Sequence, residues 1–370
     1  MSKVLVTGGE GFIGSHTVDR LVSMGHDVVV LDNLERQVHN GKIPSFRNSK
    51  ARYIRGDIRN KKSWLKALFG VEKVIHLAGA VGVGQSFWQT RKYVDVNIKG
   101  TATLFEIIAT EKRIRHEIEK IVVASSKSLY GEGAYVCRNH GKIFPLQRPI
   151  EQLEKKTWEV KCPHCEEYLK PIGIPESKPA QNLNPYALSK YATELLAMEY
   201  SYALSIPTVA FRYFNVYGPR QSLSNPYTGV LAIFLSRLKN GNHPHIFEDG
   251  NQMRDFIYVE DIARYNCLAL DNGEGVMNLG SGEPTSLNSI VSVMKDLLGS
   301  SVESFVPGEF RPGDNRHDYA DVELLRKTFG KSEFVKLRQG LEALIEWGKD
   351  ATAVDMFEKE ERERGRYLSK

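Results

Sequence analysis

The sequence predicts an α/β protein with a doubly wound parallel sheet, and three observations predict it. A glycine-rich turn at residues 7–14 lies between a short apolar strand, expected at residues 3–6, and a helix expected at residues 13–23. A second strand, expected at residues 26–32, ends in the carboxylate of Asp32. Apolar strands and helical segments then alternate as far as residue 211, which is the order of a Rossmann-like sheet.

The glycines of this turn have the spacing of a loop that holds a dinucleotide pyrophosphate. Gly8 permits a tight turn, Gly11 lets the backbone approach the phosphates, and Gly14 lets the helix pack closely on the strand. Asp32 is placed to accept hydrogen bonds from an adenosine ribose and to repel a 2′-phosphate. We therefore expect NAD rather than NADP, a preference that the nearby Arg36 weakens only slightly. The alternative is a purely structural turn.

The remaining elements follow in order. Strands are expected at residues 52–56, 74–77, 121–124 and 208–211, and helices at residues 61–69, 93–110 and 187–204. Polar and small residues collect at the carboxyl ends of these strands, where such sheets bind ligands. Beyond residue 220 the pattern becomes a mixture of turns, short strands and helices. We expect residues 1–220 to form the dinucleotide-binding domain, with an insert at 132–180, and residues 221–370 mainly a smaller mixed α/β substrate-binding domain.

The composition is that of an ordinary globular enzyme. Hydrophobic residues make up 41% of the 370 residues, and no apolar run approaches the ~20 residues of a membrane helix. No signal peptide is evident before the first strand, so a cytoplasmic location is expected. The net charge of +5, from 50 basic and 45 acidic residues, does not indicate nucleic acid. The alternating charges at residues 358–366 predict a solvated helix face.

The catalytic prediction rests on Tyr186 and Lys190, four residues apart at the start of an expected helix. That spacing places both side chains on one helix face, where the ammonium can stabilise a phenolate. Lowering a tyrosine pKa from ~10 to near 7 requires roughly 4 kcal/mol, which a lysine and a positive nicotinamide ring can supply. Tyr186 then becomes a general base toward a substrate hydroxyl, with Ser126 holding the same oxygen. The alternative is an ordinary amphipathic turn.

The insert carries a second pattern, a Cys-x-x-His at Cys137 and His140 and a Cys-x-x-Cys at Cys162 and Cys165. This spacing predicts a structural zinc site with those four ligands, His164 being the substitute for His140. A disulfide is the competing interpretation, which a cytoplasmic location disfavours. Cys267, in an apolar helical run, is expected to be a core residue.

Several further motifs resemble the extended short-chain dehydrogenases/reductases of the sugar-nucleotide epimerase and dehydratase group, over nearly the whole chain. They are Gly56-Asp57-Ile58, His76-Leu77-Ala78-Gly79, Val96 to Thr101, Ser125 to Gly131, Arg212 to Arg220, Arg254-Asp255-Phe256 and Arg311 to Asp314. The resemblance implies NAD contacts at Gly8, Gly11, Phe12, Ile13, Gly14, Asp32, Asn33, Asp57, Ile58, Leu77, Ala78, Gly79, Asn97, Tyr186 and Lys190. It implies substrate contacts at Ser86, Ser126, Asn215, Arg220, Arg254, Arg311 and Asp314, with the arginines on the diphosphate; a surface ion pair is the alternative for each arginine.

The residues after Ser126 favour one reaction of this family. Dehydratases usually carry acidic side chains there, and decarboxylating relatives a glutamate, whereas this chain has Lys127 and Ser128. We therefore expect redox-neutral 4-epimerisation of a nucleotide sugar. The insert and three loops, at residues 82–86, 126–133 and 221–229, most resemble those of the dTDP-L-rhamnose 4-epimerases. UDP-hexose or UDP-uronate 4-epimerisation is the alternative, and an inactive protein that uses its zinc insert as a binding module is the alternative of another class.

The family resemblance also implies a homodimer joined through a four-helix bundle. The two long helices carry apolar stripes that exceed what packing on a sheet alone needs. The stripes are Val94, Ile98, Leu104, Ile107 and Ile108, and Tyr191, Leu195, Met198 and Tyr202.

Overall fold

A seven-stranded parallel sheet forms the centre of the larger part of the molecule in the computed structural model, which describes residues 1–370 except 40, 182–183 and 369–370. The strand order is β12-β9-β5-β4-β1-β2-β3. The strands are β1 (Lys3–Thr7), β2 (Asp27–Asp32), β3 (Arg52–Arg55), β4 (Lys73–His76), β5 (Lys120–Ser126), β9 (Thr208–Tyr213) and β12 (Gly275–Leu279). The predicted doubly wound sheet is confirmed, and its order reverses between β1 and β4.

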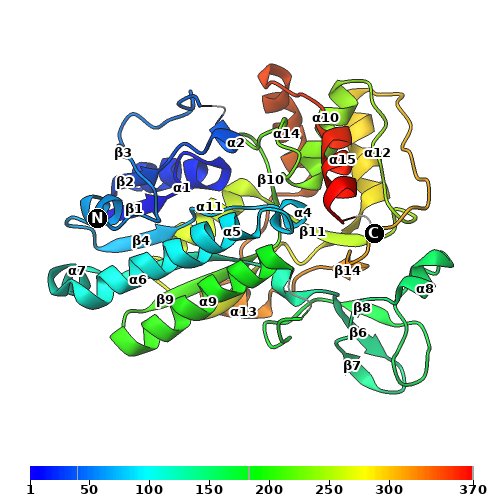
Figure 1. The fold of residues 1–370 in the computed structure, drawn as a ribbon, viewed down its shortest axis with the longest axis horizontal. Coiled ribbons are helices and arrows are strands. Elements are labelled where there is room, and N and C mark those ends of the chain that lie inside the picture. Colours follow the sequence, from blue (N-terminus) through cyan, green and yellow to red (C-terminus); the bar gives the residue numbers. More distant parts are fainter. Residues whose placement is uncertain (40, 182–183, 369–370) are drawn as a thin grey trace.

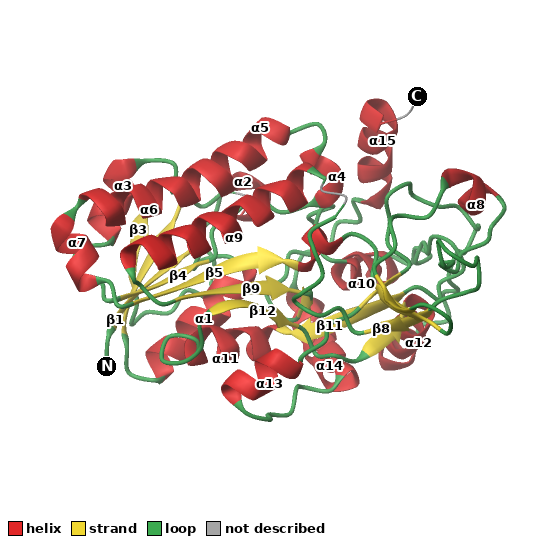
Figure 2. Ribbon diagram, turned by 90° about the horizontal axis from the view of Figure 1, so that it is seen from below, coloured by secondary structure: helices red, strands yellow, loops and turns green. Residues whose placement is uncertain are grey.

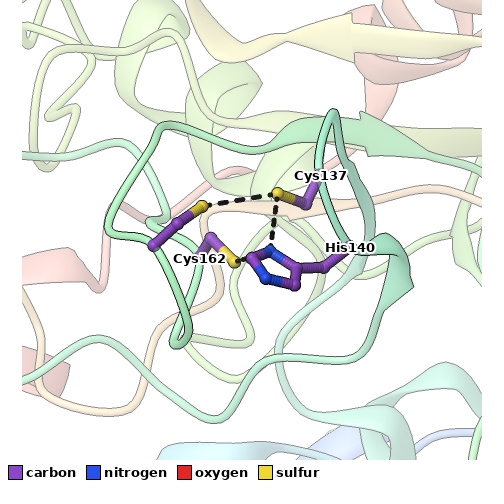
Figure 3. A group of neighbouring side chains, drawn as sticks. Cys137, His140 and Cys162 are labelled. Atoms are coloured by element: carbon purple, nitrogen blue, oxygen red, sulfur yellow. Dashed lines mark hydrogen bonds between the residues drawn. The ribbon is translucent and has the colours of Figure 1, made fainter.

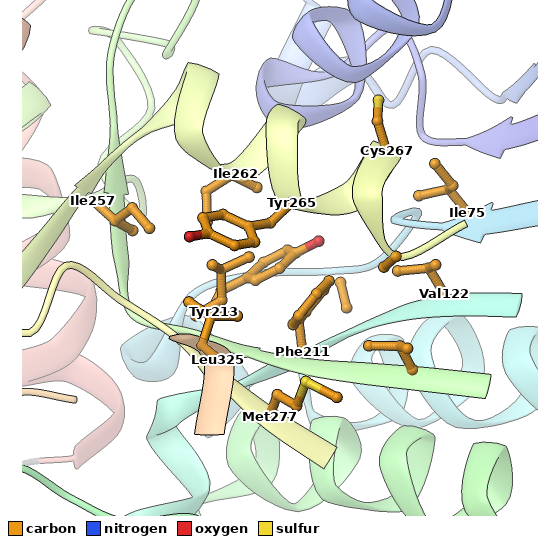
Figure 4. Packing of buried hydrophobic residues seen from close by; sticks show 14 of the residues in the cluster. Ile75, Val122, Phe211, Tyr213, Ile257, Ile262, Tyr265, Cys267, Met277 and Leu325 are labelled. Atoms are coloured by element: carbon orange, nitrogen blue, oxygen red, sulfur yellow. The ribbon is translucent and has the colours of Figure 1, made fainter. Parts of the chain in front are cut away.

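Helices cover both faces of this sheet (Figure 2). One face carries α1 (Phe12–Ser23), α11 (Val259–Leu268) and α13 (Glu323–Phe329), and the other carries α3 (Lys61–Ala67), α6 (Gly100–Thr110) and α9 (Pro185–Leu204). A hydrophobic core lies on each face of the sheet, the first core beside α1 and α11 and the second core beside α3 and α6. Because strand side chains alternate between faces, Val4 and Val6 enter the first core and Leu5 enters the second. Figure 4 shows Ile262 of α11 in the first core, which also contains Cys267, as expected.

The helix expected at residues 93–110 contains a wider turn. It runs through α5 (Thr90–Tyr93), a π-helical segment (Val94–Lys99) and α6. Single π turns are frequent at functional sites, because they release backbone groups from the regular ladder. Here the carbonyl of Asn97 accepts hydrogen bonds from the side chains of Thr101 at 2.6 Å and Thr193 at 3.2 Å.

A second unit is built on a small mixed sheet of β10 (Asn215–Tyr217), β11 (Met253–Tyr258), β13 (Pro284–Ser286) and β14 (His317–Asp318). Its helices are α10 (Val230–Lys239), α12 (Leu287–Leu298), α14 (Leu337–Asp350) and α15 (Phe357–Leu368), the last drawn in red in Figure 1. Residues 221–370 do not stay within this unit, because α11 and β12 return to the large sheet. The carboxyl ends of the parallel strands face this second unit (Figure 2).

The insert forms a third, separate sheet with strands β7 (Gly141–Ile143), β6 (Ala134–Cys137) and β8 (Lys170–Ile172), next to α8 (Ile150–Glu154). It lies at the lower right of Figure 1, beside β14. Its core is small and contains Tyr135, Cys137, Ile143, Val160, Cys162 and Leu169. Short helices complete the description: α2 (Arg36–His39), α4 (Val83–Ser86), α7 (Lys112–Glu117) and a 3-10 turn (Lys127–Tyr130). None of the described helices is long and apolar enough to span a membrane.

Candidate functional site

The glycine-rich turn has the close packing that its spacing predicts. Gly8 has a φ of +68°, and a Cβ there would lie 2.9 Å from the backbone of Ala78. A Cβ at Gly14 would overlap the carbonyl oxygen of Gly8. Both positions therefore require glycine, the first for its conformation and the second for the approach of α1 to the turn. Gly11 is the N-cap of α1 and has no side chain that could cap the helix, so the first N–H groups are left for a ligand.

Asp32 lies at the end of β2 next to this turn. Its buried carboxylate accepts hydrogen bonds from the backbone N–H groups of Glu10 at 3.1 Å and Leu34 at 2.9 Å. The Glu10 carboxylate in turn binds the guanidinium of Arg47. Asp32 therefore shapes the turn in addition to offering an anionic acceptor.

The residues expected around the adenosine lie on the neighbouring loops. The Asn33 side chain donates to Asp57 at 3.1 Å, and the Arg59 guanidinium holds the pKa of Asp57 at about 2. Ile58 is buried in the second core, and its carbonyl accepts a hydrogen bond from Trp64. Asp57 is thus a fixed carboxylate close to Asn33.

The loop at Leu77, Ala78 and Gly79 is fixed from both sides. The Thr7 hydroxyl accepts hydrogen bonds from the N–H groups of Leu77 at 3.2 Å and Ala78 at 3.1 Å. The Asn97 side chain accepts from the N–H of Ala80 at 2.7 Å and donates to its carbonyl at 3.0 Å. Asn97 also donates to Ser189 of α9 at 2.8 Å. The loop is therefore tied directly to the helix that carries Tyr186.

Tyr186 and Lys190 lie one turn apart near the start of α9, where the Asn184 side chain caps the helix by accepting from Ala187 N. Ser126 ends β5, and its side chain lies beside the Tyr186 phenol, close enough to affect the pKa of that phenol. The Ser126 hydroxyl accepts from Ser128 Oγ at 2.9 Å. The structure thus brings together Ser126 and Tyr186 from elements far apart in the sequence.

The pKa values around this pair have clear physical causes. Burial raises the pKa of Tyr186, and the neighbouring Ser126 hydroxyl opposes the rise. Burial lowers the pKa of Lys190 to about 8, against the opposing effect of the Glu194 carboxylate. The lowered phenol pKa expected from the sequence is therefore not found in the protein alone, because desolvation outweighs the stabilising contacts.

No role in the site was predicted from the sequence for two residues near the pair, Glu194 and Arg212. Glu194, one turn after Lys190, accepts a hydrogen bond from Ser125 at 2.6 Å and pairs with Arg212 at 2.6 Å. Arg212 also donates to the Tyr130 hydroxyl at 2.7 Å. All four side chains are buried, so this network fixes the end of β5 against α9 and β9. The signal in the sequence was a charged pair inside apolar segments, at Glu194 and Arg212.

The residues that are expected to contact the substrate differ in burial and in their hydrogen-bond partners. Ser86 is fully buried in α4 and donates to the Val83 carbonyl, so its hydroxyl has an internal partner. Asn215 in β10 donates to the carbonyl of Asp255 at 2.8 Å. The side chain of Asp314 is exposed.

The three expected arginines all have protein partners. Arg220 pairs with Asp19 of α1 at 2.7 Å and lies over the ring of Phe46. Arg254 donates to the carbonyls of Met253, Arg316 and Asn315 and lies 3.4 Å from Asp318. Arg311 pairs with Glu360 at 3.1 Å and with Glu361, both of α15. Its Nε is buried and has no hydrogen-bond partner within the described residues.

Because Glu360 is buried against Arg311, the interpretation of residues 358–366 as a solvated face is wrong for its inner side. The helix is held by contacts with residues far away in the sequence. Tyr367 stacks on Trp88, and Glu363 binds the Tyr227 hydroxyl. Burial raises the pKa of Glu360 to about 7.

The four predicted metal ligands converge in the insert, and Figure 3 shows Cys137, His140 and Cys162 of this group. Their ligand atoms all lie within 4.8 Å of one another. His140 Nδ1 lies 3.4 Å from Cys137 Sγ and 3.6 Å from Cys162 Sγ, and Cys137 Sγ lies 3.6 Å from Cys165 Sγ. Tetrahedral zinc with Zn–S of about 2.3 Å and Zn–N of about 2.0 Å separates its ligand atoms by about 3.5–3.8 Å. The residues therefore fit zinc, with His140 rather than His164 in the group.

Comparison with known proteins indicates the same family as the sequence motifs. The model of the NAD dependent epimerase/dehydratase family matches residues 4–149 and 165–280. A putative UDP-glucose 4-epimerase of Methanocaldococcus jannaschii is 33% identical over 94% of this chain and 98% of its own length. The dTDP-L-rhamnose 4-epimerase of Burkholderia thailandensis is 33% identical over 93% of this chain and 94% of its own.

Among solved structures, the UDP-glucuronic acid 4-epimerase of Bacillus cereus, in complex with UDP-glucuronic acid and NAD, superimposes with a TM-score of 0.74 at 28% identity. The match covers 94% of this chain and 99% of that one. The family model skips residues 150–164, which lie in the insert and include Cys162. With the glycine turn, Asp32 and the pair of Tyr186 and Lys190 in place, the chain belongs to the NAD dependent epimerase/dehydratase family and is an isomerase of the nucleotide-sugar 4-epimerase kind.

Proposed function

We propose that this enzyme interconverts dTDP-L-rhamnose and dTDP-6-deoxy-L-talose through a transient 4-keto sugar. The observation that carries the chemistry is the position of Ser126, which ends β5 beside Tyr186, with Lys190 one helical turn further along α9. Ser126 and Tyr186 would both contact the 4-hydroxyl oxygen. Tyr186 takes the proton of that hydroxyl, and Lys190 stabilises the phenolate.

When bound, NAD would supply reversible hydride transfer at C4 and a positive ring that favours the phenolate; the 4-keto sugar would turn between the two transfers, so that its other face receives the hydride. The NAD would lie along the glycine turn, Asp32, the Leu77 to Gly79 loop and Asn97. Tyr186 gives its proton back to the C4 oxygen in the second half of the reaction, so no acid or oxidant is consumed. Elimination would require an acid that Lys127 and Ser128 do not supply, and Lys127 is paired with Asp318 at 2.6 Å.

Three sugar nucleotides should be compared directly as substrates. The dTDP-6-deoxyhexose is supported by the similarity to the Burkholderia enzyme, and a UDP-hexose by an equal identity to the Methanocaldococcus protein. Purified enzyme with NAD should be given dTDP-L-rhamnose, UDP-galactose and UDP-glucuronate separately, and the products separated by chromatography. The highest kcat/KM on dTDP-L-rhamnose would support our choice, and a preference for either UDP-sugar would assign the alternative.

We also propose that Cys137, His140, Cys162 and Cys165 bind one zinc ion. The spacing of the four ligand atoms and the closed set of three thiolates and one imidazole support a structural site without an open position. The insert's core is small, and a metal would supply the stability that so few apolar side chains cannot.

A homodimer through α5, the π-helical segment, α6 and α9 is a further proposal. Val94, Leu188, Leu195 and Tyr202 on these elements are exposed and apolar, which supports it. Leu104, Ile107 and Ile108, expected in the same stripe, instead pack into the second core under the sheet. The interface would therefore be narrower than the sequence suggested.

A further inference from the structure

The insert contacts one side of the segment at residues 311–321, which includes Arg311 and Asp314. Gln147 donates to the carbonyl of Gly313 at 2.6 Å, and Arg148 donates to that of Asp314 at 3.0 Å. Further along, the N–H of Ile174 donates to the carbonyl of Tyr319 at 2.8 Å. These contacts reach the backbone of the segment, so they fix its path rather than a single side chain.

Glu132 lies where the insert leaves the dinucleotide-binding domain. Its single side chain makes several of these contacts. Its carboxylate is almost fully buried and accepts hydrogen bonds from the N–H of Arg316 at 2.8 Å and of His317 at 3.2 Å. It also accepts from the Tyr135 hydroxyl at 2.8 Å. A Cβ at Gly133 would overlap the carbonyl oxygen of His317. The chain after Glu132 therefore approaches the segment as closely as a backbone can.

The side chain of Arg316 continues the connection. It is buried and pairs with Glu159 of the insert at 2.5 Å and with Glu248 at 3.0 Å and Asp249 at 2.7 Å. Arg148 of the insert pairs with Glu248 at 2.7 Å, so the two arginines share one carboxylate. Glu159 also binds the His317 ring at 3.1 Å. A buried network of this kind is rigid when its members are satisfied, because removing one partner leaves the others desolvated.

The other side of the segment faces the substrate-binding unit. His317 and Asp318 form β14 and pair with Met253 and Arg254 of β11. The carboxylate of Asp318 binds Lys127, the residue next to Ser126. The segment is therefore held between the insert and the elements that adjoin the reacting residues.

We propose that the insert holds the segment at residues 311–321 in the position that binds a nucleoside diphosphate. Glu132 and Glu159 are the positioning residues, and their contacts with this segment raise its affinity for the nucleoside diphosphate. This rests on the proposed function, which assigns Arg311 and Asp314 to the sugar nucleotide. Glu132 acts through the backbone of Arg316 and His317, and Glu159 acts through the side chains of the same two residues. Neither residue touches the glycine turn, Tyr186 or Ser126 in the described contacts.

The test is a comparison of binding constants in full-length enzyme. Glu132→Gln replaces one carboxylate oxygen, and Glu159→Gln removes a charge from a side chain that is 43% exposed. Both should raise the Kd for UDP or dTDP, whichever the wild type binds, and the KM of the sugar nucleotide by roughly tenfold, which is the loss of one hydrogen bond to a charged group. The Kd for NAD and kcat should stay within about twofold. Glu154→Gln is the matched control, an exposed carboxylate in α8 of the same insert.

Each outcome has one meaning. If the wild type binds neither UDP nor dTDP, the proposed function fails. If the wild type binds and Glu159→Gln has an unchanged Kd, or shifts NAD and nucleoside diphosphate equally, the positioning inference is overturned. If Glu132→Gln does not fold, Glu159→Gln decides alone.

Discussion

Arg311 and Glu360 form an ion pair at 3.1 Å. This pair joins a residue that is expected to bind the substrate diphosphate, Arg311, to the C-terminal helix α15. The guanidinium also binds Glu361 and stacks over Phe247. Because the same guanidinium is assigned to the substrate diphosphate, a nucleoside diphosphate has to compete with these carboxylates.

Replacing both Glu360 and Glu361 with Gln should therefore tighten nucleoside diphosphate binding. The expected fall in Kd for UDP or dTDP is on the order of threefold to tenfold, in line with a partly buried ion pair. Isothermal titration calorimetry measures it directly. Glu358→Gln on the same helix is the control, since its carboxylate is largely exposed and 3.8 Å from Arg237. Weaker binding by the double variant would show that the helix carboxylates help to build the site instead.

Tyr186→Phe should reduce kcat by about 10²–10⁴-fold, because the base that takes the hydroxyl proton is lost. Affinity for the sugar nucleotide should be nearly unchanged. Steady-state kinetics and binding by calorimetry separate the two effects. Tyr202→Phe is the control and should leave kcat unaltered, because Tyr202 lies on the same helix outside the site and the variant keeps the ring that the proposed dimer interface would use. Retained activity in Tyr186→Phe would remove this residue as the base.

Asp32→Ala should weaken NAD binding by roughly tenfold and reduce the discrimination against NADP, because an anionic acceptor and two hydrogen bonds to the turn are lost together. The ratio of the two Kd values, measured by fluorescence titration, is the informative quantity. Asp27→Ala, an exposed carboxylate at the start of the same strand, supplies the comparison. An unchanged ratio would contradict the assigned role of Asp32.

Elemental analysis of purified enzyme should find about one zinc per chain. Cys162→Ser should lose the metal, because three ligands hold a structural zinc far less tightly than four. Cys267→Ser should retain it, since that thiol is buried in the sheet core and is not one of the four clustered ligands. A metal-free preparation with full activity and unchanged thermal stability would rule out a structural zinc.

Local patterns explain what could be predicted from the sequence. The glycine turn, the strand ending in Asp32 and the spacing of Tyr186 and Lys190 each lie within a few neighbouring residues, and the four metal ligands fall in two short motifs. Such patterns report backbone geometry and helix faces directly. The parallel sheet follows from them, because its strands are joined by helical crossovers.

What could not be predicted depends on contacts between distant parts of the chain. Asn97, in the π-helical turn, contacts the loop at Ala80 and the helix at Ser189, and the raised pKa of Tyr186 results from burial. The charge pattern at residues 358–366 is that of a solvated helix, and only the distant Arg311 explains why Glu360 is buried. Polar residues with remote partners are the ones for which a linear pattern is least informative.

Proton NMR of the enzyme with NAD and dTDP-L-rhamnose in D2O tests the central claim most directly. Direct return of the hydride to C4 predicts a new 4-epimer that carries no solvent deuterium on the sugar carbons. Deuterium at a ring carbon, or a 4-keto-6-deoxy product, would mean that the enzyme enolises or eliminates, and would contradict 4-epimerisation by Tyr186, Lys190 and Ser126.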